Sequence, residues 1–313
     1  MKGDWKKLKK NLKEKIYQAQ CLGDVEPIEY MVPYPDIAAI VDGMVIKHGD
    51  KLLYSDLGWT RVDVHNRIKQ TANWLMSQGV NPKERVFLEP IQFPYAEILA
   101  FAIWTLGASL VIADSSIADE AANITGASFS ISENPFPNCL DDQPESFNPT
   151  VIPLLKDEAV VYCTKGGNIQ LSHYNVLVNT YGVEKSLILS SGSVLFSDLD
   201  ATSTAWLVLQ TILPLYSGGS FSEKNPSCSF EKDYALRYEW KKLEDLSENE
   251  ISILPENTAV LSVGPNPIHM TGIEYENETL KIEGHSIMMG YLDEEKNEER
   301  FQSGWFCKNI KNV

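Results

Sequence analysis

The chain has 313 residues, 43% of them hydrophobic, so it is long enough to bury one large core or two smaller ones. The formal net charge of −16 argues against nucleic acid as a partner, because phosphate binding needs clustered Lys and Arg. Five cysteines without a C-x-x-C pair argue against a disulfide framework or a zinc site.

The first twenty residues predict a basic amphipathic helix. The apolar residues that recur at helical spacing are Trp5, Leu8, Leu12, Ile16 and Tyr17, with lysines at most positions between them. Two interpretations stay open: the apolar stripe packs on the body of the protein, or the helix lies on an anionic membrane surface. The segment lacks the apolar centre of a signal peptide, and no apolar run reaches the length of a membrane span, so we expect a cytoplasmic protein.

The next part of the chain predicts alternating helices and strands. Expected helices cover residues 33–42, 60–78, 93–106 and 119–124, and expected strands cover residues 85–88, 109–112 and 128–132. A hairpin is expected across His48-Gly49-Asp50, and Thr60 with Asp63 forms an N-cap pattern. This alternation is typical of a parallel sheet flanked by helices, and residues 134–153 predict a surface connection.

The stretch from Val160 to Asn175 is the first candidate for a binding element. Its sequence predicts a strand, a loop at Gly166-Gly167 and a helix that begins at Ser172. A glycine loop before a helix N-terminus presents unpaired N–H groups that can hold an anion. An ordinary strand-to-helix connection capped by Ser172 is the alternative.

The remainder of the chain changes character after residue 220. Helices are expected over residues 172–187, 204–215 and 234–246, a strand over 193–197, and short antiparallel strands over 259–263, 272–275 and 280–283, the last two joined at Asn277-Glu278. The expected organisation is a basic helix (1–24), an α/β domain (25–220), a variable connection (221–258) and a small β-rich part (259–313).

Six fragments, in this order, resemble motifs of the adenylate-forming superfamily, which includes acyl-CoA ligases, luciferases and the adenylation domains of peptide synthetases. They are G-W-T-R-V-D-V (58–64), G-V-N-P-K-E-R-V (79–86), A-F-A-I-W-T-L-G-A-S-L-V (100–111), L-S-H-Y-N (171–175), L-P-L-Y-S-G-G (213–219), and G-H-S-I-M-M-G-Y-L (284–292) with F-Q-S-G-W-F (301–306). The resemblance implies an α/β fold of stacked, mostly parallel sheets flanked by helices. It also implies an ancestral reaction in which a carboxylate attacks ATP to give acyl-AMP and pyrophosphate.

The resemblance places a remnant nucleotide site, for ATP or AMP, at Thr164, Lys165, Gly166, Gly167 and Asn309. The family's phosphate loop reads T-S-G-T-T-G-x-P-K-G-V-x-L-S-H. In this chain, the segment between Thr164 and Ser172 is five residues shorter than the segment between the first Thr and the Ser of that pattern. No counterpart of the family's Y-G-x-T-E segment, whose Glu serves magnesium, is found between residues 220 and 259, so no metal ligand is assigned. Asn309 stands where the family uses an Asp to hold the ribose hydroxyls, and an amide is a weaker acceptor there.

These departures all weaken the same chemistry, because adenylation depends on positive charge and backbone donors around the phosphates. We therefore expect a synthetase-like protein with lost or much reduced adenylating activity that acts as a binding or regulatory subunit. The chain stops at Val313, so we expect that it lacks the family's small lid domain with its catalytic lysine. One alternative is an active ligase completed by a lid domain on a partner chain, and another is a membrane-surface scaffold that uses residues 1–20.

Three further residues fall inside these motifs. His173 is expected to serve the start of the helix together with Ser172, with a ligand role as the alternative. Cys163 and Cys307 are weak candidates for nucleophiles, since the sequence places no base beside either thiol.

Overall fold

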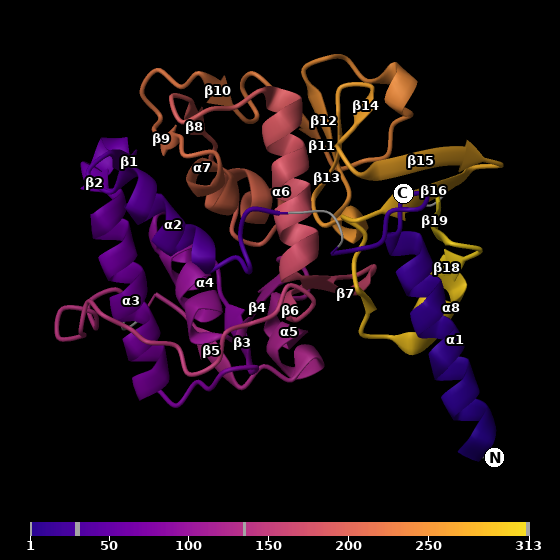
Figure 1. Ribbon diagram of the computed structural model, residues 1–313, viewed down its shortest axis with the longest axis horizontal. Helices are drawn as coiled ribbons and strands as arrows, with labels where there is room; N and C mark the ends of the chain where they lie inside the picture. The colour runs from indigo at the N-terminus through magenta and orange to yellow at the C-terminus, as the bar shows by residue number, and fades with distance from the viewer. Residues whose placement is uncertain (1, 29–31, 134–135, 311–313) are drawn as a thin grey trace.

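The computed structural model describes residues 2–28, 32–133 and 136–310, and it has the expected mixed α/β architecture with a β-rich C-terminal part (Figure 1). Its helices are α1 (Lys2–Gln20), α2 (Ala39–His48), α3 (Arg61–Ser77), α4 (Tyr95–Leu106), α5 (Ala118–Thr125), α6 (His173–Leu187), the π-helix η2 (Trp206–Ile212), α7 (Leu213–Tyr216) and α8 (Glu294–Arg300), with short 3-10 turns η1 (Ser55–Leu57), η3 (Leu243–Asp245) and η4 (Pro255–Asn257). No helix in the described part of the chain is long and apolar enough to cross a membrane.

The largest sheet has six strands in the order β17-β7-β6-β4-β3-β5. Its strands are β3 (Arg85–Leu88), β4 (Ser109–Ala113), β5 (Phe129–Ile131), β6 (Glu158–Thr164), β7 (Gly167–Ser172) and β17 (Gly290–Tyr291). Strands β6, β4, β3 and β5 are parallel, whereas β7 and β17 add an antiparallel edge. Helix α4 packs on one face and α5 on the other, which explains why the central strands are apolar along their whole length.

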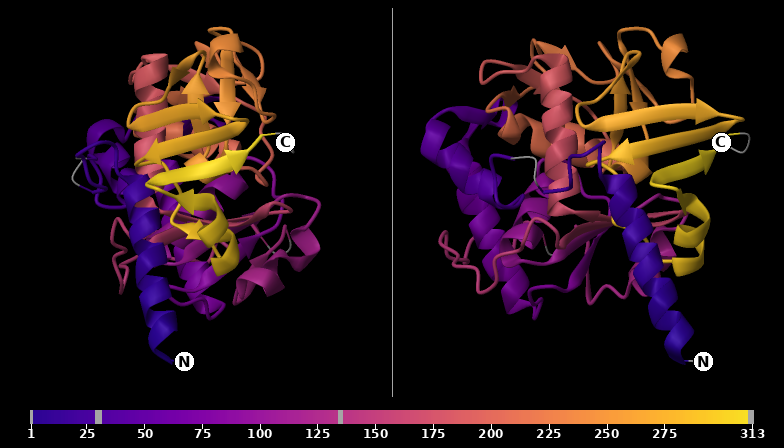
Figure 2. Two further views of the ribbon diagram at one scale, coloured as in Figure 1. Left: turned by 90° about the vertical axis from the view of Figure 1, so that its right-hand side faces the viewer. Right: turned by 45° about the vertical axis from the view of Figure 1, so that its right-hand side comes forward.

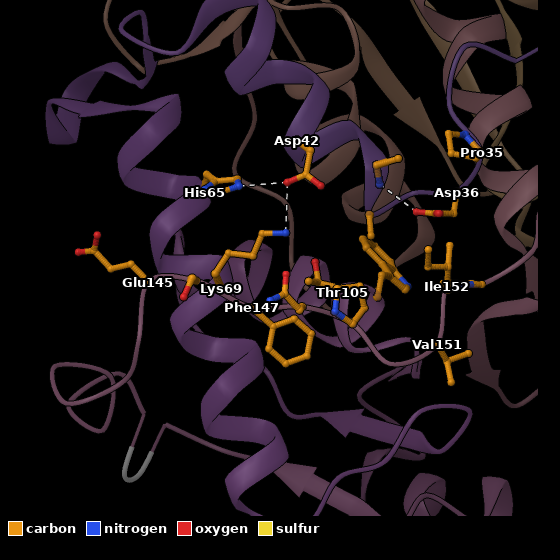
Figure 3. A pocket seen from close by; sticks show the side chains of 17 residues that line it. Pro35, Asp36, Asp42, His65, Lys69, Thr105, Glu145, Phe147, Val151 and Ile152 are labelled. Carbon is orange, nitrogen blue, oxygen red and sulfur yellow. Dashed lines mark hydrogen bonds and ion pairs between the residues drawn. The ribbon is translucent and has the colours of Figure 1, made fainter.

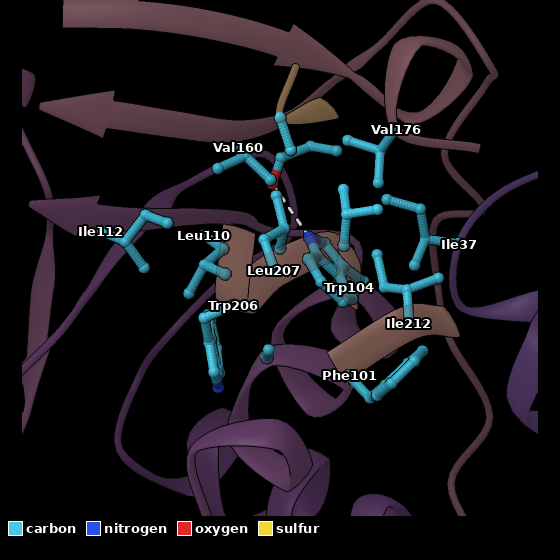
Figure 4. Close-up of a cluster of buried hydrophobic side chains, with 14 of the residues drawn as sticks. Ile37, Phe101, Trp104, Leu110, Ile112, Val160, Val176, Trp206, Leu207 and Ile212 are labelled. Atoms are coloured by element: carbon cyan, nitrogen blue, oxygen red, sulfur yellow. Dashed lines mark hydrogen bonds between the residues drawn. The ribbon is translucent and has the colours of Figure 1, made fainter. Parts of the chain in front are cut away.

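The main core lies between this sheet, α4 and η2 (Figure 4). Trp104 and Trp206 are among its largest fully buried side chains. The Trp104 indole Nε1 donates a 2.9 Å hydrogen bond to the carbonyl of Ala159, so the ring is packed without leaving its N–H unpaired. Strand residues alternate between the two faces: Leu110 joins the Trp104 side and Val111 joins the α5 side.

Three smaller sheets complete the fold. A five-stranded, largely parallel sheet runs in the order β10 (Cys228–Ser229), β8 (Val194–Phe196), β9 (Ser220–Phe221), β1 (Leu52–Tyr54) and β2 (Trp59–Thr60). A four-stranded sheet contains β11 (Ala235–Arg237), β12 (Glu250–Ile253), β13 (Val260–Val263) and β14 (Asn266–Pro267). The last sheet is antiparallel and contains β15 (Thr271–Glu276), β16 (Thr279–Gly284), β19 (Trp305–Asn309) and β18 (Phe301–Gln302), with the expected turn at Asn277-Glu278.

Helix α1 packs along this C-terminal sheet (Figure 2). Leu12 and Ala19 are buried, and Ile16 is partly buried against the core. The Gln20 side chain amide donates to the carbonyls of Ile287 and Met288 at 3.2 and 3.0 Å. Leu12 and Ile16 of the predicted apolar stripe therefore face the protein itself, whereas Tyr17 is 43% exposed. The side chains of Trp5 and Leu8 lie outside the described residues.

Four predictions are wrong in place or type, and two of them concern the first sixty residues. The helix expected over residues 33–42 is α2, which begins after Asp36, whose carboxylate accepts from the Ala39 N–H at 2.9 Å. Gly43 does not end it; a Cβ there would lie 2.8 Å from the Tyr34 ring, so glycine permits this close approach. The hairpin expected at residues 48–50 is displaced to β1 and β2, which pair across η1 and Gly58.

Residues 234–246 form β11 and the η3 turn instead of the expected helix. Arg237 and Lys241 pair with Glu250 on β12 at 2.5 and 3.1 Å, so these charged side chains serve a contact with a strand.

In the connection between β5 and β6, residues 134 and 135 lie outside the described residues. The part from 136 to 153 has no regular helix or strand, as expected, although Phe136 and Phe147 are buried.

The stretch from Val160 to Asn175 is also not a strand, loop and helix. Strand β6 turns at Lys165-Gly166 and returns directly as β7, which pairs antiparallel with it from Thr164 opposite Gly167. Five strand residues, 168–172, therefore separate Gly167 from the start of α6, so the turn does not lie at the positive end of that helix.

The start of α6 instead joins separate parts of the chain. Ser172 and Asn175 form a reciprocal cap, with the Asn175 N–H 3.1 Å from the Ser172 hydroxyl. Nδ1 of the buried His173 accepts from the Ile37 N–H at 3.2 Å. The Tyr174 hydroxyl lies 2.7 Å from Nδ1 of His285, and the Asn175 amide donates to the His285 carbonyl at 2.9 Å. The expectation that His173 serves the helix start agrees with these contacts.

Acidification should weaken the fold through His173. Burial lowers its pKa to about 4, so between the unfolded value of 6.5 and pH 4 the unfolded chain binds the proton more readily. Its contribution, roughly 3 kcal/mol, is fully present above pH 6.5 and is lost as the pH falls toward 4. Urea denaturation between pH 7 and pH 4.5 should therefore show a steeper loss of stability for the native protein than for His173→Gln. Parallel pH profiles of the two proteins would contradict this assignment.

Candidate functional site

The four predicted site residues from Thr164 to Gly167 lie together at the β6–β7 turn. Lys165 and Gly166 are exposed, and the Thr164 hydroxyl donates to the Gly167 carbonyl at 2.9 Å. Gly167 has a φ of +129°, and a Cβ at this position would lie 2.7 Å from Nζ of Lys296 and 2.9 Å from the ring of Tyr291. Two side chains from the C-terminal part of the chain therefore rest against the turn.

Those two side chains belong to a charged group that we call the Glu256 cluster, consisting of Gly167, Glu256, Tyr291, Lys296 and Lys308. The Tyr291 hydroxyl donates to Oε1 of Glu256 at 2.9 Å, and Nζ of Lys308 lies 3.0 and 3.2 Å from its two carboxylate oxygens. The Lys296 ammonium lies 4.3 Å from the centre of the Tyr291 ring. Glu256 is only 7% exposed, so its charge is balanced inside the protein by Lys308.

Hydrogen bonds from helix α6 hold the turn that carries Glu256 in place. Asn179, in the middle of that helix, donates to the carbonyls of Asn257 and Val260 at 2.8 and 2.9 Å and accepts from the Val260 N–H at 3.1 Å. These bonds fix η4, the turn between β12 and β13 that carries Glu256. On the other side, Asn297 of α8 accepts from the Tyr291 N–H at 2.7 Å. The β6–β7 turn, η4 and the C-terminal sheet thus meet at the Glu256 cluster.

The electrostatics of the cluster keep its tyrosine protonated. Burial raises the pKa of Tyr291, and the Glu256 carboxylate raises it further. Burial lowers the pKa of the Lys296 ammonium, an effect that Glu256 partly opposes. Tyr162, near the end of β6, also has a raised pKa because of burial and the nearby Asp114 carboxylate. Tyr291 is therefore a neutral hydrogen-bond donor at physiological pH.

Asn309, the fifth predicted site residue, is exposed on β19, where its backbone pairs with Thr279. Its neighbour Lys308 points toward Glu256, and successive side chains of a strand face opposite sides. The structure thus brings Gly167 into the Glu256 cluster but not the side chain of Asn309.

Sequence reasoning missed Glu256 and Lys308. The segment before residue 259 contains no counterpart of a family motif that would mark Glu256. A physical signal was present nonetheless: Glu256 lies between two apolar runs, I-S-I-L and A-V-L-S, where a carboxylate is buried and needs a cation. Both of its oxygens are engaged by Lys308, so a metal ion here would have to displace that ammonium. No group of three or more His, Cys, Asp or Glu in the described part of the chain is arranged to hold a metal.

Several cavities lie in different parts of the fold. One of about 40 Å³, lined by Tyr238, Pro255 and Lys308, adjoins the Glu256 cluster. Another of about 540 Å³ lies between α2, α3 and residues 145–153 (Figure 3). At its edge Asp42 binds His65 and Lys69 at 3.0 and 3.1 Å, and these two partners lower the pKa of Asp42 to about 2.

The cysteines are unsuited to nucleophilic chemistry at neutral pH. Burial raises the pKa of Cys163 to about 11, and it also raises the pKa of Cys307. Since the thiolate is the nucleophile, both side chains remain protonated and unreactive.

Removing the cation of the Glu256 cluster should destabilise the protein. Lys308→Met leaves a buried carboxylate uncompensated and should lower the free energy of unfolding by about 2–3 kcal/mol in urea denaturation. The double variant with Glu256→Gln should recover most of this loss. Lys281→Met, which breaks the exposed pair with Glu276 on the neighbouring hairpin, is the matched control and should cost clearly less. Equal losses from both lysine variants would show that Glu256 is not a buried charge.

No family model and no curated protein matches this sequence. Solved structures do match. The N-terminal subdomain of NpsA from Klebsiella oxytoca superposes with a TM-score of 0.72 at 15% identity, over 88% of this chain and 95% of that one. MatB from Rhodopseudomonas palustris gives 0.67 at 15%, over 86% and 75%. The anthranilate CoA ligase AuaEII, in complex with anthranoyl-AMP, gives 0.69 at 15%, over 89% and 74%. Most of this chain therefore has the fold of the adenylate-forming enzymes, and in particular of their N-terminal subdomain.

Proposed function

We propose that this protein is a binding or regulatory member of the adenylate-forming fold whose ability to form acyl adenylates is lost or much reduced. The observation that carries the proposal is the Glu256 cluster. Its members Tyr291 and Lys296 rest against Gly167, on the short turn where the sequence resemblance places the phosphate loop.

Adenylation needs donors and cations directed at phosphate oxygens. Here the two-residue turn offers the exposed Lys165 and few backbone N–H groups, while Lys308 is committed to Glu256. The residues present thus fit Mg-ATP poorly, because magnesium takes oxygen ligands that are free of other cations. The adjoining cavity of about 40 Å³ is far below the roughly 300 Å³ of small ligand sites. Both features support a site filled by the protein's own side chains.

An active ligase completed by a separate lid domain is the second candidate. One observation favours it: the NpsA N-terminal subdomain, which this chain matches over 96% of that chain, has a solved structure in complex with 3-hydroxyanthranilyl-AMSN. An isolated subdomain of this fold can therefore hold an adenylate analogue. For this chain, binding of such an analogue would require the side chains of Tyr291 and Lys296 to move away from Gly167.

The first test is pyrophosphate exchange. The protein should give no ATP–pyrophosphate exchange above background with anthranilate, 3-hydroxyanthranilate or a panel of other carboxylic acids, because Lys308 is committed to Glu256 and the short turn offers few donors for phosphate oxygens. AuaEII with anthranilate serves as the positive control. Exchange that depends on any of these acids would overturn the proposal.

The second test separates the two candidates by binding. Calorimetric titration with 3-hydroxyanthranilyl-AMSN, ATP and AMP should show no binding at about 1 mM ligand. Tyr291→Ala with Lys296→Ala removes the side chains beside Gly167 and serves as the opened form. Saturable binding by the native protein favours the ligase candidate, whereas binding by the opened form alone supports occlusion by these side chains.

Membrane association through α1 is a third candidate, and its test is flotation with anionic liposomes. Because Leu12 and Ala19 are buried where α1 packs on the C-terminal sheet, these two side chains are not available to lipid, and the intact protein should stay in the aqueous fraction. Recovery with the liposomes that falls after Leu12→Asp, in protein whose circular dichroism is unchanged, would show that the helix leaves the sheet to bind lipid.

A further inference from the structure

Another large cavity, of about 570 Å³, shares no lining residue with the Glu256 cluster. It is bounded by the loop after β3 (residues 90–93), the first turn of α4, and residues 198–201 before η2. Its volume falls within the range of small-molecule sites, roughly 300–1,000 Å³.

A buried carboxylate forms one wall of this cavity. Glu97 is 1% exposed, and its Oε1 accepts hydrogen bonds from the indole Nε1 of Trp206 and the amide of Gln210, both at 2.8 Å. Gln210 is itself fixed, because its Oε1 accepts from the Ser197 hydroxyl and the Leu199 N–H, both at 2.9 Å. The carboxylate is therefore held in one orientation by neutral donors on the π-helix η2.

The second oxygen of this carboxylate is unsatisfied. Oε2 of Glu97 is buried and has no hydrogen-bond partner among the described residues. Burial raises the pKa of Glu97, and the hydrogen bonds from Trp206, from the backbone N–H of Glu97 itself and from Gln210 oppose that rise. Leaving a buried polar oxygen unpaired is unfavourable, so a ligand that supplies a hydrogen-bond donor to Oε2 would be bound more tightly. π-helical turns are also frequent at functional sites.

The remaining lining indicates the charge of that ligand. Glu133, Asp198 and Asp200 also line the cavity, and none of the described lining residues is Lys, Arg or His. Apolar surface comes from Ile91 and Phe93. The cavity thus combines an oriented buried carboxylate, an acidic rim and an apolar wall. Because the carboxylates sit on separate segments, they suit an extended organic cation better than one metal ion, whose oxygen ligands must converge within about 2.6 Å.

We propose that this cavity binds an aliphatic amine, with a primary ammonium group donating to Oε2 of Glu97. The methylene chain packs against Ile91 and Phe93, and a second ammonium group reaches the acidic rim. An ammonium supplies both the missing donor and a charge opposite to the carboxylate, and charge-assisted bonds are about twice as strong as neutral ones. The inference is independent of nucleotide binding at the β6–β7 turn.

The Trp206 indole N–H is a direct reporter, because it is bonded to Glu97. In nitrogen-15 spectra, its resonance can be identified by its loss in Trp206→Phe. At about 150 mM salt, which screens loose attraction to the acidic surface, adding 1,5-diaminopentane should shift this resonance saturably. The neutral isostere 1,5-pentanediol should not. A missing shift at about 10 mM diamine, or an equal shift with the diol or with Mg²⁺, would overturn the proposal.

Substitutions locate the ammonium. Glu97→Gln keeps the shape and an acceptor for Trp206 but removes the charge, so diamine affinity in calorimetry should fall at least about tenfold. Glu133→Gln on the rim should cost about threefold or less, and the remote, exposed Glu120→Gln should have no effect. Equal affinity of the native protein and Glu97→Gln would overturn the proposal. If Glu97→Gln does not fold, the indole shift in the native protein still decides.

Discussion

The fold depends on one buried junction at the start of α6. The neutral imidazole of His173 accepts from the backbone of residue 37, while Tyr174 and Asn175 hold His285. Further along the same helix, Asn179 fixes the turn that carries Glu256. One helix therefore sets the positions of the N-terminal segment, the β12–β13 turn and the C-terminal part. The residues of L-S-H-Y-N thus have a structural role, because they make hydrogen bonds that join distant parts of the chain.

The sequence predicted those parts of the fold that depend on local rules. The alternation of strands and helices up to residue 131 followed from apolar periodicity, and the Thr60–Asp63 capping box formed as expected. Failures came where distant residues decide. A helix was expected around residues 234–246, but Arg237 and Lys241 pair with Glu250 and the segment contains a strand. Residues 167–172 form a strand because they pair with β6. Pairing across a sheet overrides local propensity.

The candidate site was predictable only in part, for the same reason. Residue types and motif order located the β6–β7 turn. They could not reveal that Glu256 would meet Tyr291, 35 positions later, and Lys308, 52 positions later. Nor could they show that Glu97 and Gln210 share a hydrogen bond across 113 positions. A buried charge needs a partner, and partners so far apart in the sequence come together only in the completed fold.

The packing of α1 on the C-terminal sheet has a consequence for synthesis. Gln20 bonds to residues 267 and 268 positions later, so the ribosome makes α1 long before the segment on which it packs. At typical elongation rates of about 5–20 residues per second, this delay lasts on the order of tens of seconds. During that time the basic amphipathic segment is exposed beside an incomplete, acidic body. Closure of the structure is therefore a late event, and the newly made chain is most open to chaperones and membranes before it.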